Sequence, residues 1–159
     1  MNPEHSHPLP HRPGQPHRRL DTALAEIRRG RKTSHWIWYI FPQIEGLGRS
    51  SIARTYAIRD LAEACEYLCD PVLRARYEEI AGAVSDQLTG GVSPEEVMGG
   101  PTDALKLVSS LTLFRAAAQS LADEDPAFNS FARRCSSILE QTTTRGHPPC
   151  TRTVARVTG

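Results

Sequence analysis

Aromatic side chains crowd into one short segment of the chain, and this segment constrains the fold more than any other. Four of the ten aromatic residues lie within six positions, at Trp36, Trp38, Tyr39 and Phe41, and both tryptophans of the protein are among them. Next to them stands His35, the one histidine outside the terminal segments of the sequence. Rings of this size supply a large share of core and interface contacts. The segment must therefore be the most buried stretch of the fold, the floor of a binding site, or both.

Composition and charge are those of an ordinary globular domain. At 159 residues the chain has the length of one domain, and its 39% hydrophobic and 23% charged residues are typical of soluble proteins. The net charge of +1 gives no global attraction to nucleic acid or to an anionic membrane. No apolar run approaches the roughly 18 to 20 residues of a membrane span, and no signal peptide is visible. We expect a cytoplasmic protein with no nucleic-acid partner and no membrane partner.

Helix signals follow one another along most of the chain. Asp60, Asp70 and Ser93 stand where N-cap residues are expected, and the last two precede a proline at the first helical position. Apolar residues recur at helical spacings of three and four, and the longest such stripe consists of Leu107, Leu111, Phe114, Ala118 and Leu121. Signals for β-hairpins are missing. The sequence predicts an all-α fold, a compact single-domain bundle of about five to seven helices.

The two ends of the chain differ in composition from its middle. Residues 1–16 hold five prolines and three histidines, a composition that cannot bury a core. These histidines could bind a metal weakly, or the segment could be a plain leader. We expect residues 1–17 to be a disordered Pro/His-rich leader and residues 18–140 to form a single helical domain, with its first helix beginning at Asp21. Residues 141–159 are polar and contain Pro148 and Pro149, so we expect them to fray.

The aromatic segment is predicted to form a short helix over residues 33–41, with a buried strand as the alternative. As a helix, Trp36, Ile37 and Ile40 share one side, and Pro42 ends it because the residue before a proline avoids the helical conformation. A glycine-punctuated loop follows at residues 46–51. Its Arg49 and two serines would suit an anion, although the same residues would also suit a plain turn.

The four cysteines do not suggest a metal site. Cys65 and Cys69 are one helical turn apart, but no second Cys/His pair with the spacing of zinc ligands stands near them. We expect Cys65 to be a small core residue and Cys69 a partly exposed one, and we predict no metal ligands.

His35 is the first candidate for a chemical role. Its side chain has an unperturbed pKa near neutrality, and Trp36 and Trp38 beside it could form an apolar wall for a ring-shaped ligand. The alternative is a structural histidine among tryptophans that pack the core.

A second candidate lies on the helix predicted to start near Pro101. Asp103, Lys106 and Ser110 fall within about 60° of one another on that helix. A lysine at the edge of an apolar face could hold an anion or pair with Asp103 one turn away. The alternative is an exposed Asp–Lys pair with solvated serines.

Several ordered motifs resemble a known family over roughly residues 20–118. They are Ala23-Leu24-Ala25-Glu26-Ile27, Gly30-Arg31-Lys32, Ser34-His35-Trp36, Phe41-Pro42-Gln43, Gly46-Leu47-Gly48-Arg49-Ser50, Tyr56-Ala57-Ile58, Asp103-Ala104-Leu105-Lys106-Leu107 and Ser109-Ser110-Leu111-Thr112-Leu113-Phe114. Together they resemble a small bacterial and fungal family of unknown function, number eighteen-ten, often labelled calpastatin. The resemblance implies a compact, mainly helical domain without an established activity. Calpain inhibitors of that name are long disordered repeats, so we expect no such role for a chain with capped helices.

We predict a cytosolic domain with a pocket for a planar or anionic, nucleotide-like small molecule. One wall would consist of His35, Trp36, Trp38 and Gln43, the other of Lys106, Ser110 and Thr112, with Arg49 and Asp103 as further ligand contacts. In an enzyme, His35 would be the general acid/base and Lys106 the charge stabiliser. The alternative is a non-catalytic interaction module that presents exposed Trp36 and Trp38 to a protein partner. The sequence identifies no cofactor and leaves open whether the protein is an enzyme.

Overall fold

The computed structural model describes residues 17–158, with side chains from Leu20 onward. Nine helices follow one another in this part of the chain, and its β structure amounts to a parallel bridge between Ile44 and Ile58. The predicted all-α, single-domain fold is confirmed, with more helices than the five to seven expected. The proline- and histidine-rich residues 1–16, for which we predict disorder and named a weak metal site as an alternative, lie outside the described residues.

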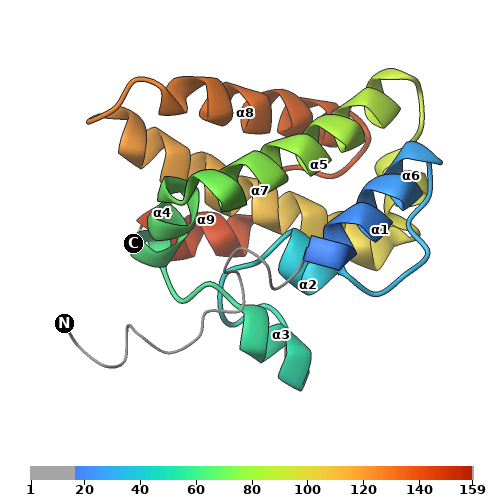
Figure 1. Cartoon of the computed structure of the whole chain (residues 1–159), viewed down its shortest axis with the longest axis horizontal. Coiled ribbons are helices and arrows are strands. Elements are labelled where there is room, and N and C mark those ends of the chain that lie inside the picture. Colours follow the sequence, from blue (N-terminus) through green and yellow to red (C-terminus); the bar gives the residue numbers. More distant parts are fainter. Residues whose placement is uncertain (1–16, 159) are drawn as a thin grey trace.

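The helices are arranged around one long central element (Figure 1). In Figure 1 α8 lies along the upper edge with α5 and α7 beneath it, while α3 projects at the lower edge. The helices are α1 (His17–Arg28), α2 (Ile37–Ile40), α3 (Ser51–Tyr56), α4 (Leu61–Cys69), α5 (Pro71–Thr89), α6 (Pro94–Met98), α7 (Pro101–Ala122), α8 (Phe128–Thr144) and α9 (Thr151–Thr158).

Helix α7 is the central element because its neighbours cover it on nearly all sides. Every residue from Leu107 to Phe114 is buried, a pattern that a helix with a single apolar face does not show. The covering helices are α4, α6, α8 and α9. Phe114 packs its ring against those of Tyr67 and Tyr77, with centroids 4.8 Å away in both cases. The predicted apolar stripe of α7 is therefore in the core, and the polar residues beside it are buried as well.

Three predicted helix starts coincide with side chains that cap a helix. Asp60 Oδ1 accepts a hydrogen bond from Glu63 N at 2.9 Å, and Asp70 Oδ1 accepts one from Val72 N at 2.9 Å. Ser93 Oγ accepts from Glu96 N at 3.1 Å, and the Glu96 carboxylate accepts in return from Ser93 N at 3.3 Å. Each bond satisfies an N–H group that the first turn of a helix leaves without an internal acceptor. The starts of α4, α5 and α6 are thus confirmed.

The aromatic segment forms a helix of four residues, α2, instead of the nine predicted over residues 33–41. The residues before α2 are not helical: Thr33 and Ser34 direct their backbone N–H groups to the carboxylate of Glu26, and Trp36, at φ −124° and ψ 3°, precedes the helix without a side-chain cap. A carboxylate on another helix thus holds the start of the aromatic segment. The expectation of burial holds for Trp36, which is 1% exposed, and for Phe41, which is 0% exposed.

Helices extend further toward both ends of the chain than predicted. α1 begins at His17, four residues before Asp21, since no helix-breaking residue stands between Pro16 and Asp21. At the other end α8 continues to Thr144, and α9 occupies Thr151–Thr158 in the segment expected to fray. Thr142 and Thr153 are fully buried there. The polar composition of this segment did not predict its helices, because threonine can be buried through its methyl group. The Thr142 hydroxyl donates to the Leu139 carbonyl at 3.0 Å.

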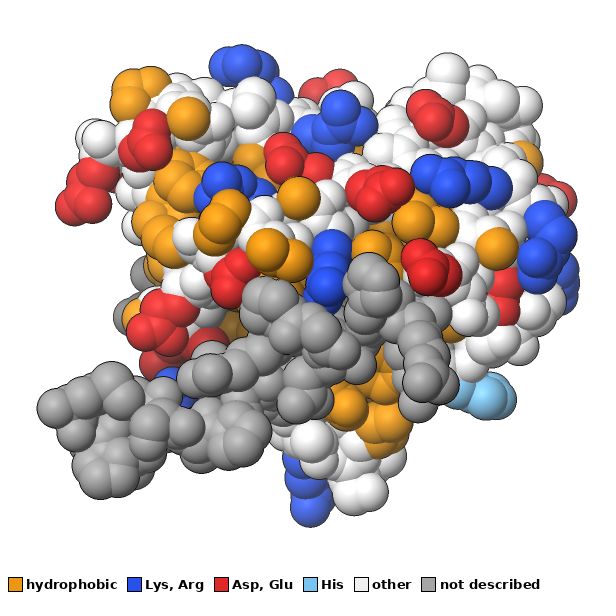
Figure 2. Space-filling view, in the orientation of Figure 1, with side chains coloured by type: hydrophobic (Ala, Val, Ile, Leu, Met, Phe, Trp, Pro, Cys, Tyr) orange, Lys and Arg blue, Asp and Glu red, His pale blue; other side chains and the backbone are white. Residues whose placement is uncertain are grey.

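The described surface carries charges of both signs. Acidic and basic side chains are interspersed among apolar ones on the face drawn in Figure 2. Within residues 17–158, none of the helices combines the length and the apolar character needed to cross a bilayer.

Candidate functional site

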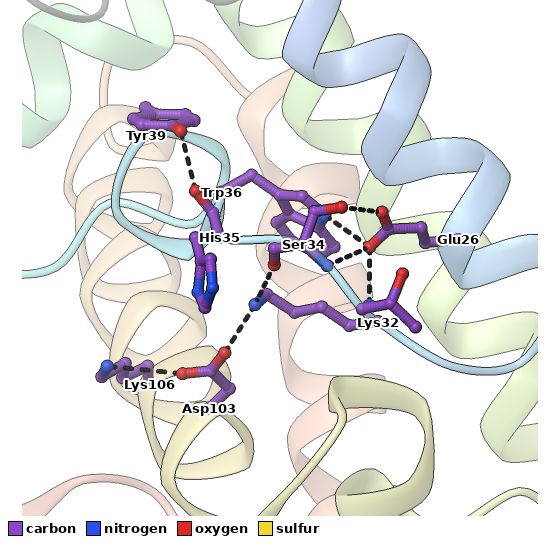
Figure 3. A network of polar contacts seen from close by, with 9 residues as sticks. Glu26, Lys32, Ser34, His35, Trp36, Tyr39, Asp103 and Lys106 are labelled. Atoms are coloured by element: carbon purple, nitrogen blue, oxygen red, sulfur yellow. Dashed lines mark hydrogen bonds and ion pairs between the residues drawn. The ribbon is translucent and has the colours of Figure 1, made fainter.

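Glu26 holds the loop that follows α1. Its side chain is buried, and its carboxylate accepts hydrogen bonds from Thr33 N at 2.7 Å, Ser34 N at 2.9 Å, the Ser34 hydroxyl and Trp36 Nε1 at 2.9 Å. Figure 3 shows these donors converging on one carboxylate. α1 presents Glu26 to the loop because the residue lies three positions, about 60°, from the fully buried Ala23.

The four donors keep this carboxyl group ionised. Burial raises the pKa of Glu26, but the hydrogen bonds from the Ser34 hydroxyl, Thr33 N, Trp36 Nε1 and Ser34 N outweigh burial and lower the pKa from 4.5 to about 2. The negative charge therefore has a structural role, because it fixes the indole of Trp36 and the start of the aromatic segment.

A network of three charged residues joins the aromatic segment to α7. Lys32 is buried and its Nζ lies 2.7 Å from Asp103 Oδ2, while Lys106 Nζ lies 3.3 Å from Asp103 Oδ1. The same two ammonium groups lie over the tryptophan rings, Lys32 at 4.9 Å from the Trp36 centroid and Lys106 at 4.2 Å from that of Trp38. Such contacts are attractive because the face of an indole ring is electron-rich. Asp103 thus links the cations that cover the two tryptophans.

A cavity of about 500 Å³ lies beside Trp38. This volume is within the roughly 300 to 1,000 Å³ of typical small-molecule sites. The lining comes from the end of the aromatic segment, the glycine loop and α3, and consists of Trp38, Gln43, Ile44, Glu45, Gly46, Gly48, Arg49, Ala53, Arg54 and Ala57. Glycine is required at position 48, because a Cβ there would lie 2.6 Å from Ala53 Cβ and 2.7 Å from Trp38 Cη2.

Gln43 lines this cavity and carries a buried donor without a partner. The residue is 4% exposed, and its Nε2 makes no hydrogen bond with any residue of the described part of the chain. Its backbone is fixed, since the Gln43 carbonyl accepts from Ile58 N at 2.8 Å and Glu45 N donates to the Ile58 carbonyl at 2.7 Å. An unmatched buried donor costs on the order of 1 to 3 kcal/mol. A ligand atom that accepts from Nε2 would remove this cost.

The glycine loop and α3 add positive charge. Arg49 and Arg54 are exposed residues of the cavity lining. Neither forms an ion pair within residues 17–158. Glu45 is the carboxylate among the lining residues, so two guanidinium groups face one negative charge.

The C-terminal helix α9 contacts the backbone at one edge of the cavity without lining it. Arg156 of α9 donates from Nη1 to the Glu45 carbonyl at 2.5 Å and from Nη2 to the Arg59 carbonyl at 3.4 Å. Glu45 belongs to the cavity lining, so this hydrogen bond connects the lining to Arg156, which lies 111 positions later in the sequence.

The two walls predicted from the sequence do not enclose one cavity. Ser110 is fully buried and its hydroxyl lies 2.9 Å from Tyr77 Oη, deep in the core. Thr112 is buried and donates to the Val108 carbonyl at 2.7 Å. Trp36 is also a core residue, so it does not belong to an exposed tryptophan surface of the kind the interaction-module alternative requires. Ser110 and Thr112 are buried because neighbouring helices cover the side of α7 that the sequence predicted to be the edge of its apolar face.

Of the remaining predicted residues, three line the cavity, two belong to the charged network, and His35 lies beside that network. Trp38, Gln43 and Arg49 belong to the cavity lining. Asp103 and Lys106 form the ion pair described above, and Lys106 reaches the Trp38 ring. His35 is exposed, its carbonyl accepts from Tyr39 Oη at 2.8 Å, and its ring points to the side of the network where Asp103 and Lys106 lie (Figure 3).

Three residues with defined roles were not singled out from the sequence. Glu26 and Lys32 look like solvent-facing charges, although Glu26 stands between two apolar positions of an otherwise amphipathic helix. Arg54 lies in a segment that carried no helix prediction, because the cap of α3 at Ser50 lacks an acidic residue three positions later.

The described residues hold no evident metal site. Within residues 17–158, His, Cys, Asp and Glu nowhere form a group of three or more that could bind a metal ion. Cys65 is partly buried, with its Sγ 3.7 Å from the Ala117 carbonyl, and Cys69 is exposed.

Comparison with known proteins identifies two similarities. The model of the family described as "Protein of unknown function (DUF1810)" matches residues 13–145. The crystal structure of the conserved hypothetical protein Rv1873 from Mycobacterium tuberculosis is similar at 35% sequence identity and a TM-score of 0.74, over 92% of this chain and 91% of that chain. No curated protein matches the sequence significantly.

Proposed function

Since the chain belongs to the DUF1810 family of proteins of unknown function, we propose a function from its geometry: binding of a small anionic molecule with a flat ring in the cavity beside Trp38. The ligand class is that of a mononucleotide. The observation that carries the proposal is the buried Nε2 of Gln43, which lacks an acceptor among the described residues and belongs to a residue that lines the cavity.

The charges favour an anion. Arg49 and Arg54 lie on the lining without ion-pair partners in the described part of the chain, and only Glu45 opposes them. Guanidinium groups bind phosphate and carboxylate oxygens through paired hydrogen bonds. The Nε2 of Gln43 would add a donor on a residue whose backbone is fixed by a bond to Ile58.

Trp38 favours a flat ring. Its indole is partly buried, lines the cavity and has Lys106 Nζ 4.2 Å from its ring centroid. Indole surfaces bind planar ligands through offset stacking. A catalytic role of His35 and Lys106 stays a prediction, and the binding proposal does not depend on it.

Isothermal titration with three probes tests the proposal. Adenosine monophosphate offers ring and anion, inorganic phosphate offers the anion alone, and adenosine offers the ring alone. We expect the monophosphate to bind more tightly than either part. Gln43→Met keeps the length of the side chain but removes its amide, and Arg49→Gln and Arg54→Gln each remove one charge. Each change should weaken binding by about tenfold, the loss of one hydrogen bond to a charged group.

Arg31→Gln is the matched control, because Arg31 is exposed and lies outside the lining. It should bind as the wild type does. The proposal fails if the monophosphate does not bind, or if it binds equally well to the three cavity variants and to the control.

A further inference from the structure

A second cavity, of about 430 Å³, lies where the later part of α8 faces α7 and the loop before α9. This volume is also within the range of small-molecule sites. Its lining shares no residue with the cavity beside Trp38. The binding of a mononucleotide proposed above therefore neither requires this cavity nor explains it.

Helix α8 supplies most of this lining from one face. Ser136, Glu140 and Thr144 follow one another at intervals of four residues, about 6 Å along the helix axis, so they lie on the same side of α8. Arg115 reaches the cavity from α7, which packs against α8. The cavity thus brings a guanidinium group of one helix and a carboxylate of the other to the same space.

Arg115 and Glu140 carry opposite charges, and neither is paired. Within residues 17–158, no ion pair joins either of them to the other or to a third residue. Opposite charges that face one cavity without contacting each other leave the space between them to a molecule that carries both charges. A zwitterion is the class of ligand that matches both groups.

The hydroxyl groups of the lining suit the two ends of such a ligand differently. Thr143 Oγ1 donates to the Leu139 carbonyl at 2.7 Å. Thr144 Oγ1 donates to the Gln141 carbonyl at 2.8 Å. The protons of both threonine hydroxyls are therefore engaged, and their oxygens remain as acceptors for an ammonium group. The Ser136 hydroxyl lines the same cavity and can donate to a carboxylate.

Two apolar residues complete the lining. Leu139 is 1% exposed, and Pro149 is half-buried in the loop before α9. This loop is fixed next to Pro149, because Cys150 N donates to Thr112 Oγ1 at 3.1 Å. An aliphatic side chain would find apolar contacts here, beside the groups that match its charged end.

We propose that this cavity binds a free amino acid with an aliphatic side chain. The Arg115 guanidinium and the Ser136 hydroxyl donate to its carboxylate. The Glu140 carboxylate and the two threonine oxygens accept from its ammonium group. Leu139 and Pro149 contact its side chain.

Amide NMR titration of the full chain with three probes tests this site. L-leucine carries both charges, isocaproate has the same aliphatic chain with the carboxylate alone, and isoamylamine has it with the ammonium group alone. We expect leucine to shift the amide signals of Ser136, Glu140 and Thr143. It should bind about tenfold more tightly than either analogue, because each analogue lacks one of the two charged groups.

Two substitutions test the two charges separately. Arg115→Gln and Glu140→Gln should each weaken leucine binding by about tenfold. Arg133→Gln is the matched control, because Arg133 is exposed on α8 and lies outside the lining, so it should bind leucine as the wild type does. If Arg115→Gln does not fold, as judged by circular dichroism, Ser136→Ala tests the carboxylate end and should weaken binding by about threefold or more. The proposal is overturned if leucine shifts none of these amide signals, if it binds no more tightly than the analogues, or if the cavity variants bind it as Arg133→Gln does.

Discussion

Replacing Glu26 by glutamine should destabilise the protein in a strongly pH-dependent way. The carboxyl has a pKa of about 2 in the folded state against 4.5 ordinarily. Each unit of such a difference corresponds to about 1.4 kcal/mol, so the ionised group contributes roughly 3 kcal/mol at neutral pH. Because the folded pKa lies below the unfolded one, this contribution is fully present above pH 4.5 and is lost as the pH falls toward 2.

Urea unfolding of the wild type and of Glu26→Gln at a series of pH values measures the effect. At pH 7 the variant should be less stable by about 3 kcal/mol, because an uncharged amide oxygen accepts more weakly from the four donors. Its near-ultraviolet signal should change because Trp36 Nε1 is one of these donors. The difference between the two proteins should shrink as the pH falls to 2.5, since below pH 4.5 the unfolded wild type gains a proton at Glu26 that the folded wild type does not yet bind. Comparing the two proteins cancels the titration of all other carboxyl groups.

Glu79→Gln is the matched control. Glu79 lies 3.6 Å from Arg28 in a pair whose side chains are 61% and 51% exposed, so its loss should cost less than about 1 kcal/mol. Stability curves of wild type and Glu26→Gln that run parallel from pH 7 to pH 2.5 would refute the reasoning, because they would mean that Glu26 is not held ionised by its four donors.

Three further sets of substitutions test the core, the turns and the cavity. Tyr77→Phe and Ser110→Ala should each cost about 1 to 2 kcal/mol in urea unfolding, and the double variant should cost less than their sum, since one buried bond is shared. Gly99→Ala should destabilise the protein by more than about 2 kcal/mol, because the residue has φ +80° and its new Cβ would lie 2.5 Å from the Lys32 carbonyl oxygen. Gly91→Ala, at φ +102° with open space around the Cβ, should cost about 1 kcal/mol. Equal losses of stability would contradict this reasoning. Gly48→Ala should leave the helical circular-dichroism signal intact but displace the Trp38 ring, visible as a shift in its fluorescence and as weaker binding of adenosine monophosphate; unchanged binding would mean that the ring position is irrelevant.

The helices that the sequence predicted well are those with local signals. Asp60, Asp70 and Ser93 cap α4, α5 and α6 by bonds to residues two or three positions away, so the information lies within a few residues. α2 was predicted too long for the opposite reason. The residues before α2 are held by Glu26, which lies seven and eight residues earlier on another helix, and no local pattern indicates such a contact.

Of the predicted site residues, only Trp38, Gln43 and Arg49 belong to the cavity lining, and the predicted arrangement of two walls does not occur. Trp38, Gln43 and Arg49 lie in one continuous stretch, so their common cavity follows from short-range geometry. Ser110 and Thr112 were wrongly predicted to line a cavity. Periodicity gives the face of the helix on which a residue lies, but it does not show which other helices pack against that face. The burial of Lys32 depends equally on a distant partner, Asp103, across 71 positions.

The bond from Arg156 to the Glu45 carbonyl makes the cavity and the end of the chain thermodynamically linked. A ligand that orders Glu45 and Gly46 also strengthens the docking of α9, and docked α9 in turn raises the affinity for that ligand by the same factor. α9 contributes no residue to the lining. Hydrogen exchange of its amides would therefore report occupancy of the cavity from a segment outside it.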